Sequence, residues 1–175
     1  GSSMSSIAGF ATYSKNLTEQ LRLNTGIRYT QNQLDAVFHS DPRDWALPYD
    51  NLSYKYTALT GNISLAFHPD DSWKIATIAS TGFHAPNIDD TGKLFYKGSI
   101  LTIPNFNLEP EYARTVELNI TKNVNNRLLF NANTYYTFIE GAIMRVNTNL
   151  DFLINQDEFF TEAKTNKNTG NAEIY

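Results

Sequence analysis

The chain of 175 residues has no cysteine and no apolar run near the roughly 20 residues that a membrane-spanning helix needs. Without cysteine, a disulfide framework and thiolate-bound zinc or iron–sulfur sites are excluded. Lys+Arg number 14 and Asp+Glu 18, with no basic cluster, so the electrostatic footprint of nucleic-acid binding is missing. The opening GSSMSSIAGF lacks the basic start and long apolar stretch of a signal peptide. These absences leave open a membrane protein built of short, alternating strands, whose hydropathy signal is weak.

Sequence signatures of catalysis are also missing. The three histidines, His39, His68 and His84, fall in unrelated loops. No Gly-x-Ser-x-Gly elbow, His-Glu-x-x-His zinc motif or phosphate-binding glycine loop occurs. The acidic pairs in NIDD and HPDD lie in turns or loops, where solvated carboxylates are ordinary. We therefore predict no enzyme activity, no metal site and no cofactor.

Alternation with a period of two dominates the remainder, and it indicates strands with one apolar and one polar face. Four segments alternate cleanly and two others less so, and TNKNTGNAEIY, residues 165–175, indicates a loop that leads into a further strand. The clean segments are residues 20–31, 56–69, 111–123 and 126–140; the weaker ones are 6–16 and 72–83. On their polar faces lie Arg22, Asn24, Arg28, Asn62, Asn131 and Asn133.

The connections between these segments alternate between short and long. KNLTE, HPDDS and NVNN have hairpin length and turn composition, whereas residues 31–55 and 83–110 form long connections. Outer-membrane barrels have short turns on one side and long loops on the other, with strands of about 9 to 11 residues. The pattern predicts an all-β, antiparallel up-and-down sheet of about 6–8 strands that forms part of a larger transmembrane β-barrel.

Two alternatives remain open. In a soluble β-sandwich binding module for carbohydrate or protein, the apolar faces of two sheets would pack on each other. A small outer-membrane barrel complete in itself would need one or two more strands, and FLINQDEFFTEAK could supply one. Connection pattern and strand length favour part of a larger barrel over both.

The second long connection begins with TGFHAP, residues 81–86, and ends with NFNLEPE, residues 105–111. These two boxes resemble those of the TonB-dependent outer-membrane receptors. TGFHAP resembles the Phe-Arg-Ala-Pro box, with His84 where arginine is usual, and NFNLEPE resembles the Asn-Pro-Asn-Leu box, with Phe106 where proline is usual. LRLNTGIRYTQNQ, YYTFIEGAIMR and NTGNAEIY resemble neighbouring strands of the same family, so the likeness covers nearly the whole chain. The box residues are Phe83, His84, Ala85, Pro86, Asn105, Asn107, Leu108, Pro110 and Glu111.

The resemblance implies a fold, a location and partners. It implies a segment of a roughly 22-stranded outer-membrane barrel, with residues 1–175 as a single unit without the plug domain. The implied partners are outer-membrane lipid, the remaining barrel and its plug, TonB through an N-terminal part outside this sequence, and a small-molecule metal chelate. The implied function is uptake of a scarce nutrient complex such as an iron-siderophore, haem or cobalamin. On this reading the polar strand faces line the lumen.

Aromatic residues in the long loops are the candidate ligand contacts, because tryptophan and tyrosine combine a large apolar face with a hydrogen-bonding tip. The candidates are Trp45, Tyr49, Tyr54, Tyr56, His84, Phe95 and Tyr96. Haem receptors of the family carry a ligand histidine between the two boxes, but residues Asn87 to Pro104 contain none. We interpret His84 chiefly as the end of a strand, with Pro86 stopping the hydrogen-bond ladder because it has no N–H.

Overall fold

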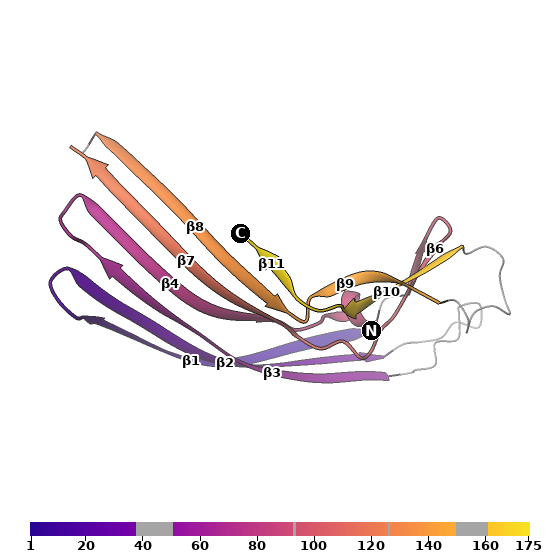
Figure 1. The fold of residues 1–175 in the computed structure, drawn as a ribbon. Coiled ribbons are helices and arrows are strands. Elements are labelled where there is room, and N and C mark those ends of the chain that lie inside the picture. Colours follow the sequence, from indigo (N-terminus) through magenta and orange to yellow (C-terminus); the bar gives the residue numbers. More distant parts are fainter. Residues whose placement is uncertain (38–50, 93, 126, 150–160) are drawn as a thin grey trace.

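The computed structural model describes residues 1–37, 51–92, 94–125, 127–149 and 161–175, which form two sheets joined end to end (Figure 1). The large sheet has seven strands in the order β1-β2-β3-β4-β7-β8-β11, and the small sheet has four in the order β5-β6-β10-β9. The strands of the large sheet are β1 Ser2–Asn16, β2 Leu21–Val37, β3 Asn51–Phe67, β4 Trp73–His84, β7 Glu111–Val124, β8 Leu128–Glu140 and β11 Ala172–Ile174. Those of the small sheet are β5 Phe95–Lys97, β6 Ile100–Ile103, β9 Ile143–Thr148 and β10 Glu162–Asn168.

The large sheet is antiparallel throughout, and its register gives it two chemically different faces. Residues that pair directly share a face, so Leu23 opposite Leu65 and Thr77 opposite Leu118 place these side chains together. We call this the apolar face. Six of its aliphatic side chains are between 37% and 63% exposed: Ile27, Leu59, Ile63, Leu65, Val116 and Leu118. The predicted alternation of clean strands is confirmed.

The opposite side, the polar face, carries asparagine, arginine and hydroxyl side chains that bond across strands. Asn133 Nδ2 donates to Asn119 Oδ1, and Asn24 Nδ2 donates to Ser64 Oγ over 3.4 Å.

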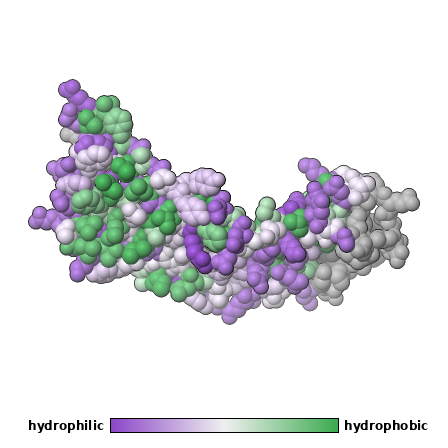
Figure 2. All heavy atoms as spheres, viewed as in Figure 1, coloured by the Kyte–Doolittle hydropathy of each residue, from purple (hydrophilic) through white to green (hydrophobic). Residues whose placement is uncertain are grey.

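Both weaker segments also form strands, β1 and β4. Figure 2 shows hydrophobic residues gathered over the large sheet and a more hydrophilic surface toward the small one.

Three tight turns close the hairpins at the end of the large sheet remote from the small sheet (Figure 1). In the β3–β4 turn, Asp70 accepts hydrogen bonds from the hydroxyl of Ser72 and, at 2.7 Å, from its backbone N–H; first the hydroxyl and then the N–H hold the pKa of the Asp70 carboxyl below its usual range. In the β1–β2 turn, the Thr18 hydroxyl accepts from the N–H of Leu21 at 3.0 Å. Asx- and ST-type bonds of this kind fix short turns, and these turns occur where the sequence predicts them.

Aromatic side chains mark both ends of the apolar face. Near the turns, Lys122 Nζ lies 4.4 Å from the Trp73 ring centroid and donates to Ser72 Oγ over 2.5 Å. Near the small sheet, the rings of Phe83 and Tyr112 stack with centroids 6.4 Å apart. The apolar face is therefore a band bounded by aromatics at each end.

The long connections contain more regular structure than the sequence indicates. β2 continues to Val37 and β3 begins at Asn51, so residues 31–37 and 51–55 of the predicted 31–55 loop are strand. The alternation is hidden there because apolar residues also occupy the side of β2 and β3 that is polar elsewhere. Leu34, Ala36 and Leu52 lie on that side and are buried together. Residues 83–110 contain the short helix α1 Ile88–Thr91 and the hairpin β5–β6, where the sequence predicts only loop.

The small sheet corrects two further details. β10 pairs with β6 in parallel, so the chain is not up-and-down throughout. Residues 165–168, predicted as loop, belong to β10, and residues 162–164 of the FLINQDEFFTEAK segment begin it. Over the described residues, no helix is long and apolar enough to cross a membrane.

Candidate functional site

The candidate site is the joint between the two sheets, where the ends of β4 and β7 meet α1 and the small sheet. At its centre His84 pairs with Glu111 across β4 and β7. His84 Nδ1 lies 2.9 Å from Glu111 Oε2, and Nε2 lies 4.0 Å from Asp90 Oδ2. The His84 side chain is 53% exposed, and the two carboxylates are 23% and 24% exposed. The imidazole thus sits between two acids but remains open on one side.

Glu111 also holds the chain that leaves β8. Its Oε1 accepts the backbone N–H of Ile143, the first residue of β9, at 2.6 Å. Just before it, Gly141 has φ +70°, a left-handed turn that favours glycine. One carboxylate therefore fixes the end of β4 and the start of β9.

A capping box starts α1. Asn87 Oδ1 accepts the backbone N–H groups of Asp89 and Asp90 at 2.7 and 3.1 Å, and Asp90 Oδ2 accepts the N–H of Asn87 at 3.0 Å. The same Asp90 oxygen faces His84, so Asp90 links the start of α1 to the end of β4.

Asparagine side chains connect the small sheet to the large one. Asn168 Nδ2 donates to the carbonyls of Glu109 at 3.0 Å and Gly141 at 2.7 Å, while its Oδ1 accepts the N–H of Glu109 at 2.9 Å. Asn166 Nδ2 donates to the carbonyl of Asp90 at 3.0 Å, and Asn105 Nδ2 donates to that of Asn166 at 2.8 Å. These amides therefore bond backbone groups that lie far from them in the sequence.

Tyr54 and Tyr56 lie on β3 with ring centroids 5.6 Å apart. Tyr54 packs with Ile88 and Phe106 against the buried cluster of Leu34, Ala36 and Leu52. The hydroxyl of Tyr56 donates to the carbonyl of Leu108 at 3.2 Å. Burial, reinforced by the neighbouring Tyr54, raises the pKa of Tyr56 to about 12.

Other ligand candidates are placed as follows. Phe95 begins β5, with the Arg145 guanidinium 5.4 Å from its ring centroid. Of Tyr96 only the backbone, in β5, is described. Trp45 and Tyr49 lie outside the described residues. The structure thus brings His84, Tyr54 and Tyr56 to the joint and Phe95 to the adjoining small sheet.

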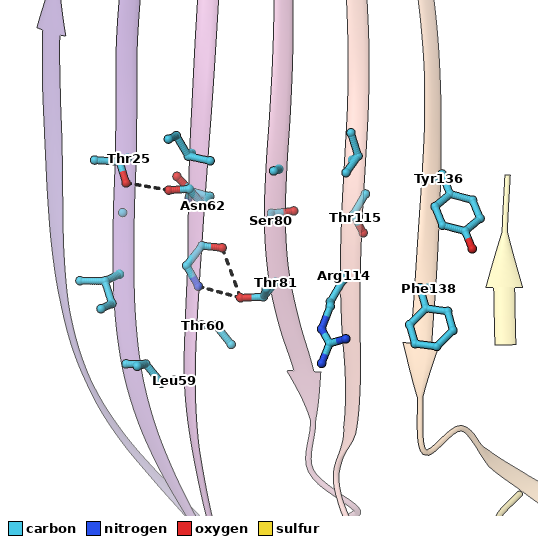
Figure 3. A pocket seen from close by; sticks show the side chains of 16 residues that line it. Thr25, Leu59, Thr60, Asn62, Ser80, Thr81, Arg114, Thr115, Tyr136 and Phe138 are labelled. Atoms are coloured by element: carbon cyan, nitrogen blue, oxygen red, sulfur yellow. Dashed lines mark hydrogen bonds between the residues drawn. The ribbon is translucent and has the colours of Figure 1, made fainter. Parts of the chain in front are cut away.

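The sheet wall opens beside the joint. β3 and β4 pair only between residues 62–67 and 75–80. Beyond this point the Thr81 hydroxyl replaces backbone pairing, accepting the Gly61 N–H at 2.9 Å (Figure 3). Here the apolar face has a hollow of about 680 Å³ that includes Leu59, Ile63 and Tyr136. The polar face has a smaller hollow of about 260 Å³ beside Arg28 and Asn62.

The predicted polar-face residues do share one side of the large sheet. Arg28 lies opposite Thr60, and Asn62 lies opposite Ser80. Arg22 Nε donates to Ser14 Oγ at 3.0 Å, and Thr121 Oγ1 donates to Asn131 Oδ1 at 2.9 Å. The same parity places Asn24 and Asn133 on this side.

Comparison with known proteins decides the family. A family model described as "TonB dependent receptor-like, beta-barrel" matches residues 1–175.

The chain belongs to the TonB-dependent receptor β-barrel family.

Solved structures of TonB-dependent receptors share its fold. A double mutant of the Serratia marcescens hemophore receptor HasR, in complex with its hemophore HasA and heme, is 14% identical with a TM-score of 0.76, over 97% of this chain and 30% of that one. The copper transporter OprC is 15% identical with a TM-score of 0.72, over 94% and 24% of the two chains. FyuA, the ferric yersiniabactin uptake receptor of Yersinia pestis, is 17% identical with a TM-score of 0.61, over 82% and 21%.

This receptor segment therefore spans at most about a third of the length of these structures. No curated protein matches the chain. At these identities the likeness establishes the fold alone.

The two family boxes lie in the joint. In the first, Ala85 is 8% exposed and Pro86 is fully buried, while Phe83 stacks on Tyr112. In the second, Leu108 is 3% exposed, and Asn105 Oδ1 accepts the N–H of Asn107 at 3.0 Å. Pro110 directly precedes β7, and its carbonyl oxygen would lie 3.6 Å from the Cβ of any larger residue at position 141.

Sequence reasoning missed three residues of this receptor's joint and small sheet. Asn166, Asn168 and Arg145 make contacts across the chain, with Asn166 Nδ2 reaching Asp90 from 76 positions away. The density of asparagine in TNKNTGN is the available signal, but the composition of this segment predicts only a loop. Within the described ranges, no group of three or more His, Cys, Asp or Glu side chains could hold a metal ion.

Proposed function

We propose that residues 1–175 form, as one unit, part of the wall of an outer-membrane TonB-dependent receptor that takes up a scarce nutrient complex. The family is one of receptors and transporters rather than enzymes. The observation that carries the proposal is the contrast between the two faces of the large sheet, one a half-exposed apolar band and the other polar. In a bilayer the apolar band would meet lipid and the polar face would line the lumen.

Aromatic residues at both ends of this band support the same placement. Tyrosine, tryptophan and snorkelling lysine are favoured at the two interfaces of a membrane. Trp73 with Lys122 would lie at the interface near the hairpin turns, and Tyr112 with Phe83 at the one near the joint. The joint and small sheet would then stand outside the cell.

The two alternative functions fit the structure less well. In a soluble β-sandwich the apolar face would be covered, yet Leu59, Ile63 and Val116 are at least half exposed. A self-contained barrel would close on itself, yet in the described chain β1 and β11 are the two edges of the large sheet and do not pair. An open edge in lipid would leave backbone groups unpaired at several kcal/mol each, so further strands of the receptor would complete the wall.

The nutrient would be recognised at the joint and small sheet, with His84, Tyr54, Tyr56, Phe95 and Tyr96 as the candidate contacts there. Trp45 and Tyr49, outside the described residues, stay candidates from the sequence alone. HasR is in complex with its hemophore and heme, OprC is a copper transporter and FyuA is a ferric yersiniabactin uptake receptor. We infer a metal chelate or haem as the cargo. A plug domain and TonB would act through parts of the receptor outside this sequence.

Neighbouring cysteine substitutions test the membrane placement, because the segment has no cysteine of its own. Ile63 is on the apolar face and Asn62 on the polar face of the same strand. In intact outer membranes of the full-length receptor, made cysteine-free elsewhere, a membrane-impermeant maleimide should label Asn62→Cys. It should label Ile63→Cys only after detergent extraction. Equal labelling of both in the membrane would contradict the proposed placement.

A growth panel tests uptake. The full-length receptor, expressed in a host lacking its own receptors for these nutrients, should restore growth on at least one of several iron-siderophores, haem or cobalamin. The same host without TonB should not grow. Growth on none of them would count against the proposed function even if the cysteine pattern held.

A further inference from the structure

One face of the small sheet is strongly cationic. Phe95 lies opposite Thr102, and Thr102 lies opposite Lys164, so these side chains share a face. Two positions along their strands, Lys97 and Glu162 fall on that same face, and so does Arg145, which lies opposite Asn166. We call this surface, made of Phe95, Lys97, Arg145, Glu162 and Lys164, the basic face.

The charge of the basic face differs in sign from that of the chain. Three cations and one carboxylate give it a net charge of 3 − 1 = +2, whereas the chain carries −4. Lys164 Nζ lies 3.6 Å from Glu162 Oε2, which neutralises one cation. Lys97 and Arg145 are exposed to solvent. A cationic surface on an acidic protein attracts anions selectively.

Arg145 is held in place by an aromatic ring. It comes from β9 and Phe95 from β5, the two outermost strands of the small sheet, yet the guanidinium lies 5.4 Å from the ring centroid. Their side chains therefore reach toward each other across the face, over Thr102, which is only 6% exposed. Stacking on an aromatic orients a planar guanidinium without using its N–H donors.

Those donors are unoccupied. In the described part of the chain, no carboxylate lies within 4.0 Å of the Arg145 guanidinium and no acceptor is hydrogen-bonded to it. An arginine fork of this kind matches two oxygens of a carboxylate or a similar planar oxygen pair. The combination of a fixed fork, free donors and a second exposed cation at Lys97 is suited to an oxygen-rich anion.

The basic face turns toward the side from which a ligand would enter the lumen. Asn166, on that face, donates to the Asp90 carbonyl of α1. Ile88 of α1 in turn packs on the cluster of Leu34 and Leu52, which extends from the polar face of the large sheet. The basic face and the polar face are thus on the same side of the molecule.

We propose that the basic face binds the cargo, and that the cargo is a multiply anionic metal chelate whose oxygens are received by Arg145 on Phe95. This inference rests on the proposed uptake function and narrows its substrate class to carboxylate or catecholate chelates. Lys97 adds long-range attraction, while neutral hydroxamate chelates would gain nothing from the fork.

Binding by the purified full-length receptor tests the assignment, with ferric citrate and a ferric tris-catecholate as anionic probes and a ferric trihydroxamate as the neutral probe. We expect tighter binding of an anionic probe, weakening with added salt. Arg145→Gln should weaken it about tenfold or more, as expected for losing charge-assisted hydrogen bonds. Arg145→Lys, which keeps the charge but not the fork, should lose an intermediate amount. Arg127→Gln, in the β7–β8 turn at the opposite end of the sheet, is the matched control and should change nothing.

The outcomes separate this inference from the proposed function. Uptake of neutral chelates alone overturns the basic-face site while the uptake function stands. The same holds if Arg145→Gln binds anionic chelates with unchanged affinity and has wild-type protease resistance. If Arg145→Gln alters protease resistance, Arg145→Lys becomes the deciding variant, and unchanged anionic affinity in it overturns the role of the fork. Uptake of haem or cobalamin alone overturns the basic-face assignment while uptake stands, and failure of the wild-type receptor to bind or import any siderophore chelate, haem or cobalamin overturns both.

Discussion

His84 and Glu111 face each other across the last residue pair of β4 and β7, with the imidazole Nδ1 2.9 Å from the carboxylate. The same carboxylate accepts the N–H of Ile143, so the pair joins the two strands to the small sheet. The main role of His84 is therefore to fix the position of the chain that follows β4.

Replacing His84 with alanine should therefore loosen the joint more than it changes ligand identity. The pair is partly exposed, so we expect a loss of stability within about 1 kcal/mol, together with faster proteolysis in residues 85–110. Limited proteolysis of the full-length receptor, followed by mass spectrometry, measures this. His68→Ala, in the β3–β4 turn, is the control and should leave the cleavage rate unchanged. A selective loss of haem binding in His84→Ala, with wild-type cleavage, would show that His84 is a ligand instead.

Asn168→Asp tests the amide link between the sheets. Aspartate keeps the acceptor for Glu109 N–H, but it replaces the donor with an oxygen facing the carbonyls of Glu109 and Gly141. Unsatisfied or repelled groups of this kind cost about 1 to 3 kcal/mol. Hydrogen exchange should increase in β9 and β10 and stay unchanged in β2. The exposed Asn171→Asp, three positions away, adds the same charge and should have little effect; comparable exchange in the two variants would argue against the link.

Gly61→Ala should destabilise the wall at its seam. A Cβ at Gly61 would lie 2.9 Å from the backbone carbonyl oxygen of Gly26, and backbone cannot move aside cheaply. Overpacking of this kind costs about 1 to 3 kcal/mol. The temperature at which the receptor loses its folded mobility on SDS gels should fall. Gly82→Ala is the matched control, because a Cβ there meets nothing within 4 Å and alanine should be neutral or slightly stabilising. An equal fall in both variants would mean that the close approach is not the cause.

Tyr56 should be among the last tyrosines to ionise. Its pKa is raised to about 12 from an ordinary value of 10, so the folded state holds the proton more tightly than the unfolded state. The resulting stabilisation is complete below about pH 10 and is lost as the pH rises toward 12. In phenolate absorbance titrations, the difference between wild type and Tyr56→Phe should appear near pH 12. Tyr13→Phe removes an exposed phenol and is the comparison; a Tyr56 difference centred near pH 10 would refute the assignment.

The large sheet could be predicted from the sequence because its determinants are local. Alternation such as that around Ile63 and Leu65 reports which side of a strand is apolar, and turn residues such as Asp70 mark the hairpins. The family could be identified from its two boxes, which are short, continuous stretches of sequence around Pro86 and Leu108. Both of these residues are buried.

The joint could not be predicted in the same way. Leu34 and Leu52 lie on the polar side of their strands, and they become buried only because Ile88 and Phe106 cover them from distant parts of the chain. Arg145 gains its place from Phe95, fifty positions earlier. Such pairings follow from the arrangement of the sheets and leave no periodic mark in the sequence.

The position of β10 between β6 and β9 also has a consequence for folding order. β6 pairs at once with β5, yet its second neighbour, β10, arrives only with Glu162, and Asn168 of β10 then bonds to Glu109 and Gly141. Hairpins such as β7–β8 close over a few residues, whereas this pairing waits for a long stretch of chain, and contacts of high sequence separation form slowly. We therefore expect the small sheet to assemble after the hairpins of the large sheet, so that a wall whose hairpins are all paired can still lack the complete small sheet.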